Sequence, residues 1–424
     1  MLKKIGTHNL LLFLLIILET LLLLHFSKLG YTTLNAVLYS GTSFFIGLLL
    51  LVKFYNKSLI STPPTNSKKI YHLYWIIPTM IFIVFTLAQL PSIIQQYKIN
   101  FTESDIIPTL QLMVYRLFNG EYVYAPYYDF GYKLNLTYLP MTWIPFVIPN
   151  VLHIDYRWLA ISVWLLCVVL LLIRTSAYSY KHPFVILSTI ITLFLFICTN
   201  EMSILGYTIE IMFAGYYMLL VMSMNTNSVM FIAITLATCM LSRFSLLLWL
   251  PLWATVMFIS GSKIKLFKII TLVSAIITIL YIIPFLSKDW QIFGNAMKSY
   301  TNAAVGEWEH IDKYTCKPAH LYNGVGFAHI FYEKIQNWDT LDKVKRLQKI
   351  HFLLCAGITV VMGIWYWFNR KKIDKRIFLM ASFKIYLTIF LAFIQVPYIY
   401  LMVVANFVSI AIFSEQLRYK TTDA

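Results

Sequence analysis

The sequence is poor in charged residues and lacks the common nucleotide- and metal-binding motifs. Only 12% of its 424 residues are charged, whereas soluble domains have about 25%. It contains no glycine-rich phosphate loop, no GxGxxG run before a helix, no CxxC pair and no HExxH, the patterns typical of nucleotide and zinc sites. Its histidines are scattered, so a tight metal site is not indicated. We therefore expect no nucleotide hydrolysis within the chain, and the energy for any reaction must come with the substrate.

Cysteine is also scarce, with five in the chain. Cys167, Cys198, Cys239 and Cys355 lie in apolar runs, and Cys316 stands alone in a polar loop. This distribution predicts small packing residues and one free thiol, with no disulfide framework.

Apolar residues, by contrast, dominate, at 59% of the chain. They recur in runs of about 16 to 22 residues, the length that crosses a bilayer as a helix. We predict an all-α, polytopic membrane protein with about 12 transmembrane helices. The expected spans are 8–26, 33–52, 73–91, 156–173, 183–198, 205–222, 228–241, 245–260, 265–286, 348–368, 376–394 and 397–414.

The segment 138–152 is apolar, but Pro140, Pro145 and Pro149 interrupt it. A proline removes a backbone donor and breaks a helix interior. We therefore expect a short re-entrant or interfacial piece on the outer side of the membrane.

The net charge of +16 fits a membrane orientation. Eighteen of the 34 basic residues, but only three of the 18 acids, lie in or at the edges of the expected inner loops, which are 1–7, 53–72, 174–182, 223–227, 261–264, 369–375 and the tail from 415. Most acids lie in two long loops, 92–155 and 287–347. Cytoplasmic loops of membrane proteins are enriched in lysine and arginine. We therefore expect the two long loops to face outward. The excess of basic residues then reflects orientation in the lipid bilayer, and no nucleic-acid partner is expected.

The most informative stretch is 100–140, where carboxylates and tyrosines are dense beside predicted spans. Asp105 precedes IIPTLQLMVYRLF at the position of a helix N-cap. Leu110, Met113, Val114 and Leu117 form an apolar stripe, with Gln111 and Arg116 off it, and Gly120 follows as a helix-ending glycine. This predicts an amphipathic helix over 106–118 at the membrane surface. Asp105 is then either a functional group or only a helix cap.

Four charged residues fall in or between apolar runs: Glu19, Glu210, Arg243 and Lys384. Such groups usually face a cavity or a partner. Packing is the expected role of Glu19, and Lys384 either snorkels or functions. Arg243 lies between two short apolar halves, where a guanidinium suits a phosphate. The alternative for Arg243 is a structural ion pair with an outer-loop acid.

These features together resemble the GT-C superfamily of integral-membrane glycosyltransferases, in particular the family-87 and mannosyltransferase-like branch. The matching features are Asp105, the helix 106–118, Gly120, Tyr122–Tyr124, Tyr138-Leu139-Pro140 and Ser242-Arg243-Phe244. The resemblance covers roughly 73–286. It implies a single transmembrane domain over 1–424, in which 1–72 adds two N-terminal spans, 73–286 is the GT-C-like module with its catalytic loop 92–155, and 287–424 holds the second outer loop and the last spans.

The resemblance implies an inverting glycosyltransferase that uses a polyprenyl-phosphate sugar as donor. Asp105 would be the general base, with Glu103 as the alternative. Arg243, and also Lys384, would bind the donor phosphate. The candidate substrate-binding residues are Tyr124, Tyr127, Tyr128, Tyr138, Glu210, His310 and His320. No cofactor is expected, although a divalent metal stays an alternative.

The expected partners are the lipid-linked donor and a glycan, lipid or protein acceptor. The expected location is a bacterial inner membrane with the site facing outward, with the endoplasmic reticulum as the alternative. Two other functions stay open. One is an O-antigen-type polymerase or ligase, which typically relies on arginine pairs in its outer loops. The other is a lipid-linked-sugar flippase or transporter, which needs charges along a path through several spans.

Overall fold

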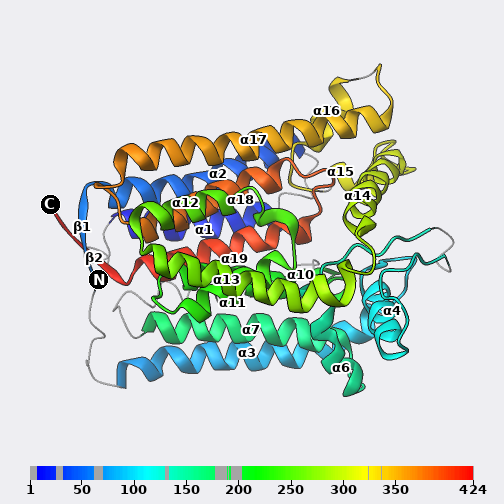
Figure 1. The fold of residues 1–424 in the computed structure, drawn as a ribbon, viewed down its shortest axis with the longest axis horizontal. Coiled ribbons are helices and arrows are strands. Elements are labelled where there is room, and N and C mark those ends of the chain that lie inside the picture. Colours follow the sequence, from blue (N-terminus) through cyan, green and yellow to red (C-terminus); the bar gives the residue numbers. More distant parts are fainter. Residues whose placement is uncertain are drawn as a thin grey trace.

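The computed structural model describes residues 7–24, 32–61, 70–128, 133–176, 189, 191, 203–322, 324–335 and 337–423. The long helices run side by side along one direction (Figure 1). The N-terminal half contains α1 (Thr7–Leu24), α2 (Thr32–Phe54), α3 (Ile70–Gln96), α4 (Ile106–Phe118), α5 (Pro140–Trp143), η3 (Ile144–Phe146), α6 (Val147–Val151) and α7 (Tyr156–Ser176). Next come α9 (Ser203–Tyr207), α10 (Glu210–Met224), α11 (Val229–Met240), η5 (Phe244–Leu246), α12 (Leu250–Ser260), α13 (Lys263–Ile277) and η6 (Thr278–Leu286). The last elements are α14 (Gln291–Glu309), α15 (Ala319–Tyr322), α16 (Ala328–Lys334), α17 (Thr340–Asn369), α18 (Lys375–Ala392) and α19 (Ile399–Gln416).

Two short strands, β1 (Lys57–Ser61) and β2 (Tyr419–Asp423), pair antiparallel, with Lys57 opposite Asp423. They lie at one end of the helix bundle, whereas α4, α6, α14, α15 and α16 gather at the other end (Figure 1). The two long loops predicted to face outward therefore meet at one end of the molecule.

Seven of the described helices are long and apolar enough to cross a membrane. They are Thr7–Leu24, Thr32–Phe54, Thr79–Gln96, Tyr156–Arg174, Lys263–Leu286, Thr340–Asn369 and Ile399–Gln416. The helical membrane class is thus confirmed, while the total of about twelve spans stays a prediction. Apart from residues 189 and 191, the expected span 183–198 lies outside the described residues.

The centre of the bundle is formed by α10 and α19, which pack against each other. Both helices are apolar on every side and almost wholly buried, as expected of a helix with neighbours all around it. α7 and α11 pack on α10, while α1 and α18 pack on α19. This central pair brings the starts of α10 and α19 to the end of the bundle where the outer segments gather.

The amphipathic helix expected over 106–118 is present as α4, and Gly120 follows it with a φ of 70°. Its buried face differs from the predicted stripe, because Ile107 is buried and Leu117 is 40% exposed. Arg116, expected to lie off the stripe, is buried and donates hydrogen bonds to the carbonyls of Val123, Ala125 and Pro126. The helix therefore holds the following loop through a charged side chain, which apolar periodicity does not reveal.

The segment 138–152 forms the short elements α5, η3 and α6. Each proline lies inside or beside one of these helical turns, and none of the turns is long enough to cross a bilayer. The structure agrees with the expected short, proline-interrupted piece.

Candidate functional site

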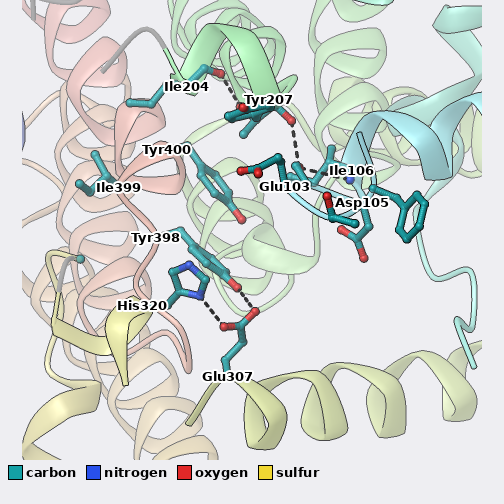
Figure 2. Close-up of a pocket in the computed structure, with 15 residues that line it drawn as sticks. Glu103, Asp105, Ile106, Ile204, Tyr207, Glu307, His320, Tyr398, Ile399 and Tyr400 are labelled. Atoms are coloured by element: carbon teal, nitrogen blue, oxygen red, sulfur yellow. Dashed lines mark hydrogen bonds and ion pairs between the residues drawn. The ribbon is translucent and has the colours of Figure 1, made fainter. Parts of the chain in front are cut away.

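A cavity of about 520 Å³ lies where the loops 92–155 and 287–347, which are predicted to face outward, meet the starts of the central helices. Segment 101–106, before α4, forms one wall, and residues of α14, α15 and the start of α19 form the other (Figure 2). The lining residues are Phe101, Thr102, Glu103, Ser104, Asp105, Ile106, Ile204, Tyr207, Thr208, Glu307, His320, Gly324, Tyr398, Ile399 and Tyr400. The cavity thus brings together three predicted site residues, Glu103, Asp105 and His320.

The first wall is a tight turn that begins at Asn100. The amides of Glu103 and Ser104 donate to the Asn100 carbonyl, and the Asn100 side chain accepts a bond from the Thr102 amide at 3.1 Å. The Ser104 hydroxyl donates to the Tyr207 carbonyl at 3.1 Å, which ties the turn to the end of α9. This turn places the carboxylates of Glu103 and Asp105 along the cavity.

Asp105 occupies the N-cap position of α4, as the sequence predicts, but its side chain makes no capping hydrogen bond. Instead, the Ser104 hydroxyl accepts a bond from the Ile106 amide at 3.4 Å. A capping role therefore does not account for the Asp105 carboxylate, which borders the cavity.

Arg157 holds the chain that leads into this wall. Its guanidinium pairs with Asp155 at 2.6 Å and donates to the carbonyls of Tyr97 and Gly206. Arg157 is only 2% exposed, and these bonds satisfy most of its donors, as burial of a charge requires. Gly206 permits the contact, since a Cβ there would meet the Tyr97 side chain at 2.5 Å. The arrangement fixes the chain just before segment 101–106.

The second wall carries a linked group of three side chains. His320 Nδ1 contacts Glu307 Oε2, and the Tyr398 hydroxyl donates to Glu307 Oε1 at 2.8 Å (Figure 2). The rings of His320 and Tyr398 lie 5.0 Å apart. Gly324 packs so tightly against the Pro397 carbonyl that a Cβ there would overlap it, which holds the loop after α15 against the start of α19.

Electrostatics in this wall favour an ionised Glu307. Burial alone would raise the pKa of its carboxyl, but the hydrogen bond of His320, the charge that this ring carries when it is protonated, and the hydrogen bond of Tyr398 outweigh burial and lower that pKa. Burial and the neighbouring Glu307 charge raise the pKa of Tyr398, to which Asp105 also contributes. Tyr398 therefore remains a neutral donor to a carboxylate.

Glu210 and Arg243 form an ion pair, and neither residue is among those that line the cavity. Arg243 Nη2 contacts Glu210 Oε1, and the guanidinium lies 4.5 Å from the centre of the Phe213 ring. Burial raises the pKa of nearby Tyr138, the charge of Asp105 raises it further, and the charge of Arg243 lowers it. The ion pair expected as the alternative for Arg243 is present, but its acid is Glu210 at the start of α10 rather than an outer-loop residue.

The tyrosines of the first outer loop mostly serve the structure. Tyr124 is 7% exposed, donates to the Tyr138 carbonyl at 2.9 Å and packs on Phe285. Tyr127 pairs with Leu134 in an isolated bridge, and Tyr128 is 61% exposed. Among the described residues that line the cavity, none of these tyrosines appears, so their predicted contact with the sugar gains no support.

Lys384, expected to bind the donor phosphate, lies in the buried centre of the bundle. Its side chain is 0% exposed and its Nζ lies 2.6 Å from Glu19 Oε1 and 2.8 Å from the Ala405 carbonyl. The packing role expected for Glu19 agrees with this pair. The charge of Lys384 is thus paired inside the protein, and its predicted contact with the donor phosphate gains no support. His310 is exposed beside the second wall but is not among the lining residues.

Sequence reasoning assigned no role to Glu307, Tyr398, Tyr400 or Tyr207. The sequence places Tyr398 and Tyr400 in the expected span 397–414, whereas the structure places Tyr398 just before α19 and Tyr400 in its first turn. Glu307 and His320 are 13 residues apart in sequence, a spacing that no local periodicity links. A signal existed in the second outer loop, where acids and histidines alternate with aromatic residues.

The cavity holds carboxylates on both walls, one imidazole and several phenol groups. Carboxylates and imidazoles accept protons and bind hydroxyl groups. Among the residues that the structure describes, no three His, Cys, Asp or Glu side chains group in a way that could hold a metal ion. The arrangement can thus bind a polyhydroxylated molecule and accept a proton from it.

Comparisons of the chain with protein-family models, with curated proteins and with solved structures found no match. The fold and the site define a helical membrane protein with a polar, carboxylate-bearing cavity at one end of its bundle.

Proposed function

We propose that this chain is a membrane glycosyltransferase that moves a sugar from a polyprenyl-phosphate donor to an acceptor on the outer side of the membrane. One observation carries the proposal: Glu103 and Asp105, selected from sequence as proton acceptors, line a cavity closed by the second outer loop. The elements that line the cavity include α14, α15 and the start of α19, and these lie at the end of the bundle where the long apolar helices end (Figure 1). A lipid-linked donor could therefore reach it from the bilayer, while a water-soluble or lipid acceptor enters from outside.

In the proposed reaction, the acceptor oxygen attacks the anomeric carbon of the sugar. The bond from that carbon to the phosphate oxygen breaks, and the configuration inverts. Asp105 takes the proton of the attacking hydroxyl, as a general base, and polyprenyl phosphate leaves. Glu103 is the alternative base on the same turn.

Arg243 is the proposed partner of the leaving phosphate. Only Nη2 of its guanidinium contacts Glu210, and a guanidinium has five donors in a planar fork. Its other donors could bind phosphate oxygens, which would stabilise the negative charge that grows as the bond breaks.

Transfer activity tests this proposal directly. The purified chain is supplied with decaprenyl-phosphate-linked hexoses and pentoses as donors and short alkyl glycosides as acceptor probes. We expect transfer by the wild type, with inversion at the anomeric carbon. Failure of every donor to react would contradict the proposal.

The second arm concerns the base. Asp105→Asn keeps the size of the side chain but removes the proton acceptor, so we expect activity to fall by about 10²–10⁴-fold with thermal stability near the wild type. Glu103→Gln is the matched control and should do much less. Full loss in Glu103→Gln with normal activity in Asp105→Asn would move the base by two residues, and normal activity in both would refute a base on this wall.

A further inference from the structure

The second wall of the cavity contains a histidine that is oriented by other side chains. His320 lies on α15, Glu307 at the end of α14 and Tyr398 just before α19. Each of the two Glu307 oxygens is engaged: Oε2 contacts His320 Nδ1, and Oε1 accepts from the Tyr398 hydroxyl. Three separate elements thus hold one imidazole in place.

This contact determines which ring nitrogen can meet a ligand. A carboxylate beside Nδ1 favours a proton on that nitrogen, so that the other nitrogen carries the lone pair. Among the described residues, the structure records no hydrogen bond to His320 Nε2, and His320 lines the cavity. Nε2 is therefore available as an acceptor for a hydroxyl group.

The opposite wall explains why such an acceptor is useful. Asp105 can take the proton of only one hydroxyl, and a single contact does not orient a molecule that carries several. A second contact from across the cavity would hold the acceptor so that its attacking oxygen faces Asp105.

We propose that His320, held by Glu307 and Tyr398, binds a hydroxyl of the acceptor through Nε2 and so orients the acceptor against Asp105. This inference rests on the proposed glycosyl transfer. It assigns the first wall to proton removal and the second wall to acceptor recognition, and the acceptor is accordingly a molecule with at least two hydroxyl groups.

The protonation state of the imidazole then affects acceptor binding. A protonated ring has donors at both nitrogens and can no longer accept the bond. The titratable and charged groups around His320 are Glu307, His310, Lys317, His329, Glu333, Tyr398, Tyr400 and, across the cavity, Glu103 and Asp105. Glu307 is the carboxylate in direct contact with the ring.

The test measures the acceptor KM and kcat between about pH 5 and 8, the range in which imidazoles titrate, with alkyl diol glycosides as acceptor probes. For the wild type we expect the acceptor KM to rise by about 3- to 10-fold toward low pH, the size of one hydrogen bond, on top of any change in kcat. His320→Gln keeps a hydrogen-bonding amide but does not titrate, so this rise in KM should disappear.

His153→Asn is the control, since His153 is exposed and is not among the residues that line the cavity. It should keep the wild-type pH dependence of KM. His320→Asn provides a second variant, and thermal unfolding in detergent shows that each variant is folded.

The outcomes separate this inference from the proposed function. Transfer activity with an unchanged KM profile in His320→Gln would overturn the role of His320 and leave the glycosyl transfer intact. A loss of 10² or more in kcat for His320→Gln at neutral pH would also overturn it, because His320 would then be the base. Absence of transfer by the wild type would overturn the proposed function and this inference with it.

Discussion

Two regions of this membrane protein use the same kinds of charged side chain in opposite ways. In the middle of the bundle, Lys384 and Glu19 are 0% exposed, and every contact they make is internal. Glu19 Oε2 accepts a bond from Ser409 at 2.6 Å. At the end of the bundle, Glu103 and Asp105 border a cavity of about 520 Å³.

The difference shows what a charge in an apolar chain indicates. A charge is costly inside a membrane protein unless it is paired or faces water. Lys384 and Glu19 neutralise each other's charge in a buried ion pair, so neither charge is available to a substrate. Glu103 and Asp105 instead border a cavity, where a substrate could contact them. Because the buried charges of Lys384 and Glu19 are paired with each other, they do not support the transporter alternative, which needs charges along a path through the bundle.

The largest expected effect concerns the closed region. Lys384→Met leaves the Glu19 carboxylate buried without its cation, and breaking a buried pair in this way costs about 3–5 kcal/mol. Thermal or denaturant unfolding of the detergent-solubilised chain measures this loss.

The double variant Glu19→Leu/Lys384→Met provides the control. Replacing both charges by apolar groups of similar volume is often close to neutral, so stability should return most of the way to the wild type. A double variant as unstable as the single one would mean that the pair does more than satisfy itself.

Arg243 lies between the two extremes, since it is paired with Glu210 but keeps a side chain that is 28% exposed. Arg243→Ala should weaken binding of a polyprenyl-phosphate donor by about 10- to 150-fold, the range of one hydrogen bond to a charged group. Arg243→Lys should retain part of the affinity, because a lysine supplies the charge without the fork. Unchanged donor affinity in a folded Arg243→Ala variant would show that Arg243, like Lys384, has only a structural role in an ion pair.

The smallest effect is a labelling experiment that leaves function unchanged. Cys316 is exposed in the second outer loop, whereas Cys167, Cys239 and Cys355 are buried. An impermeant maleimide should therefore label a Cys198→Ser form of the chain in intact cells, and Cys316→Ser should abolish the labelling of this chain. Labelling of Cys316 only after the cells are opened would turn the cavity toward the cytoplasm.

The apolar runs and their breaks predicted much of the helical framework. The ends of α1, α2, α4, α7 and α19 fall within a few residues of their expected bounds, because burial and bilayer length act on local composition. The start of α4 after Asp105 and its end before Gly120 could also be predicted, because helix caps and helix ends depend on the local sequence.

The partners of the charged residues could not be predicted from the sequence. Glu19 meets Lys384 across 365 residues of sequence, and Arg243 meets Glu210 across 33. Glu307 and Tyr398 come together only because α14 and the start of α19 converge. Such pairings depend on how the helices pack, and no periodicity in one segment specifies them.

The most direct test compares Asp105→Asn with Glu19→Leu/Lys384→Met in one transfer assay with decaprenyl-phosphate-linked sugars. The account predicts a folded Asp105→Asn variant whose activity falls by about 10²–10⁴-fold, and a folded double variant with activity close to the wild type. An active Asp105→Asn variant together with a folded but inactive double variant would contradict it, because the functional charges would then lie in the closed centre of the bundle.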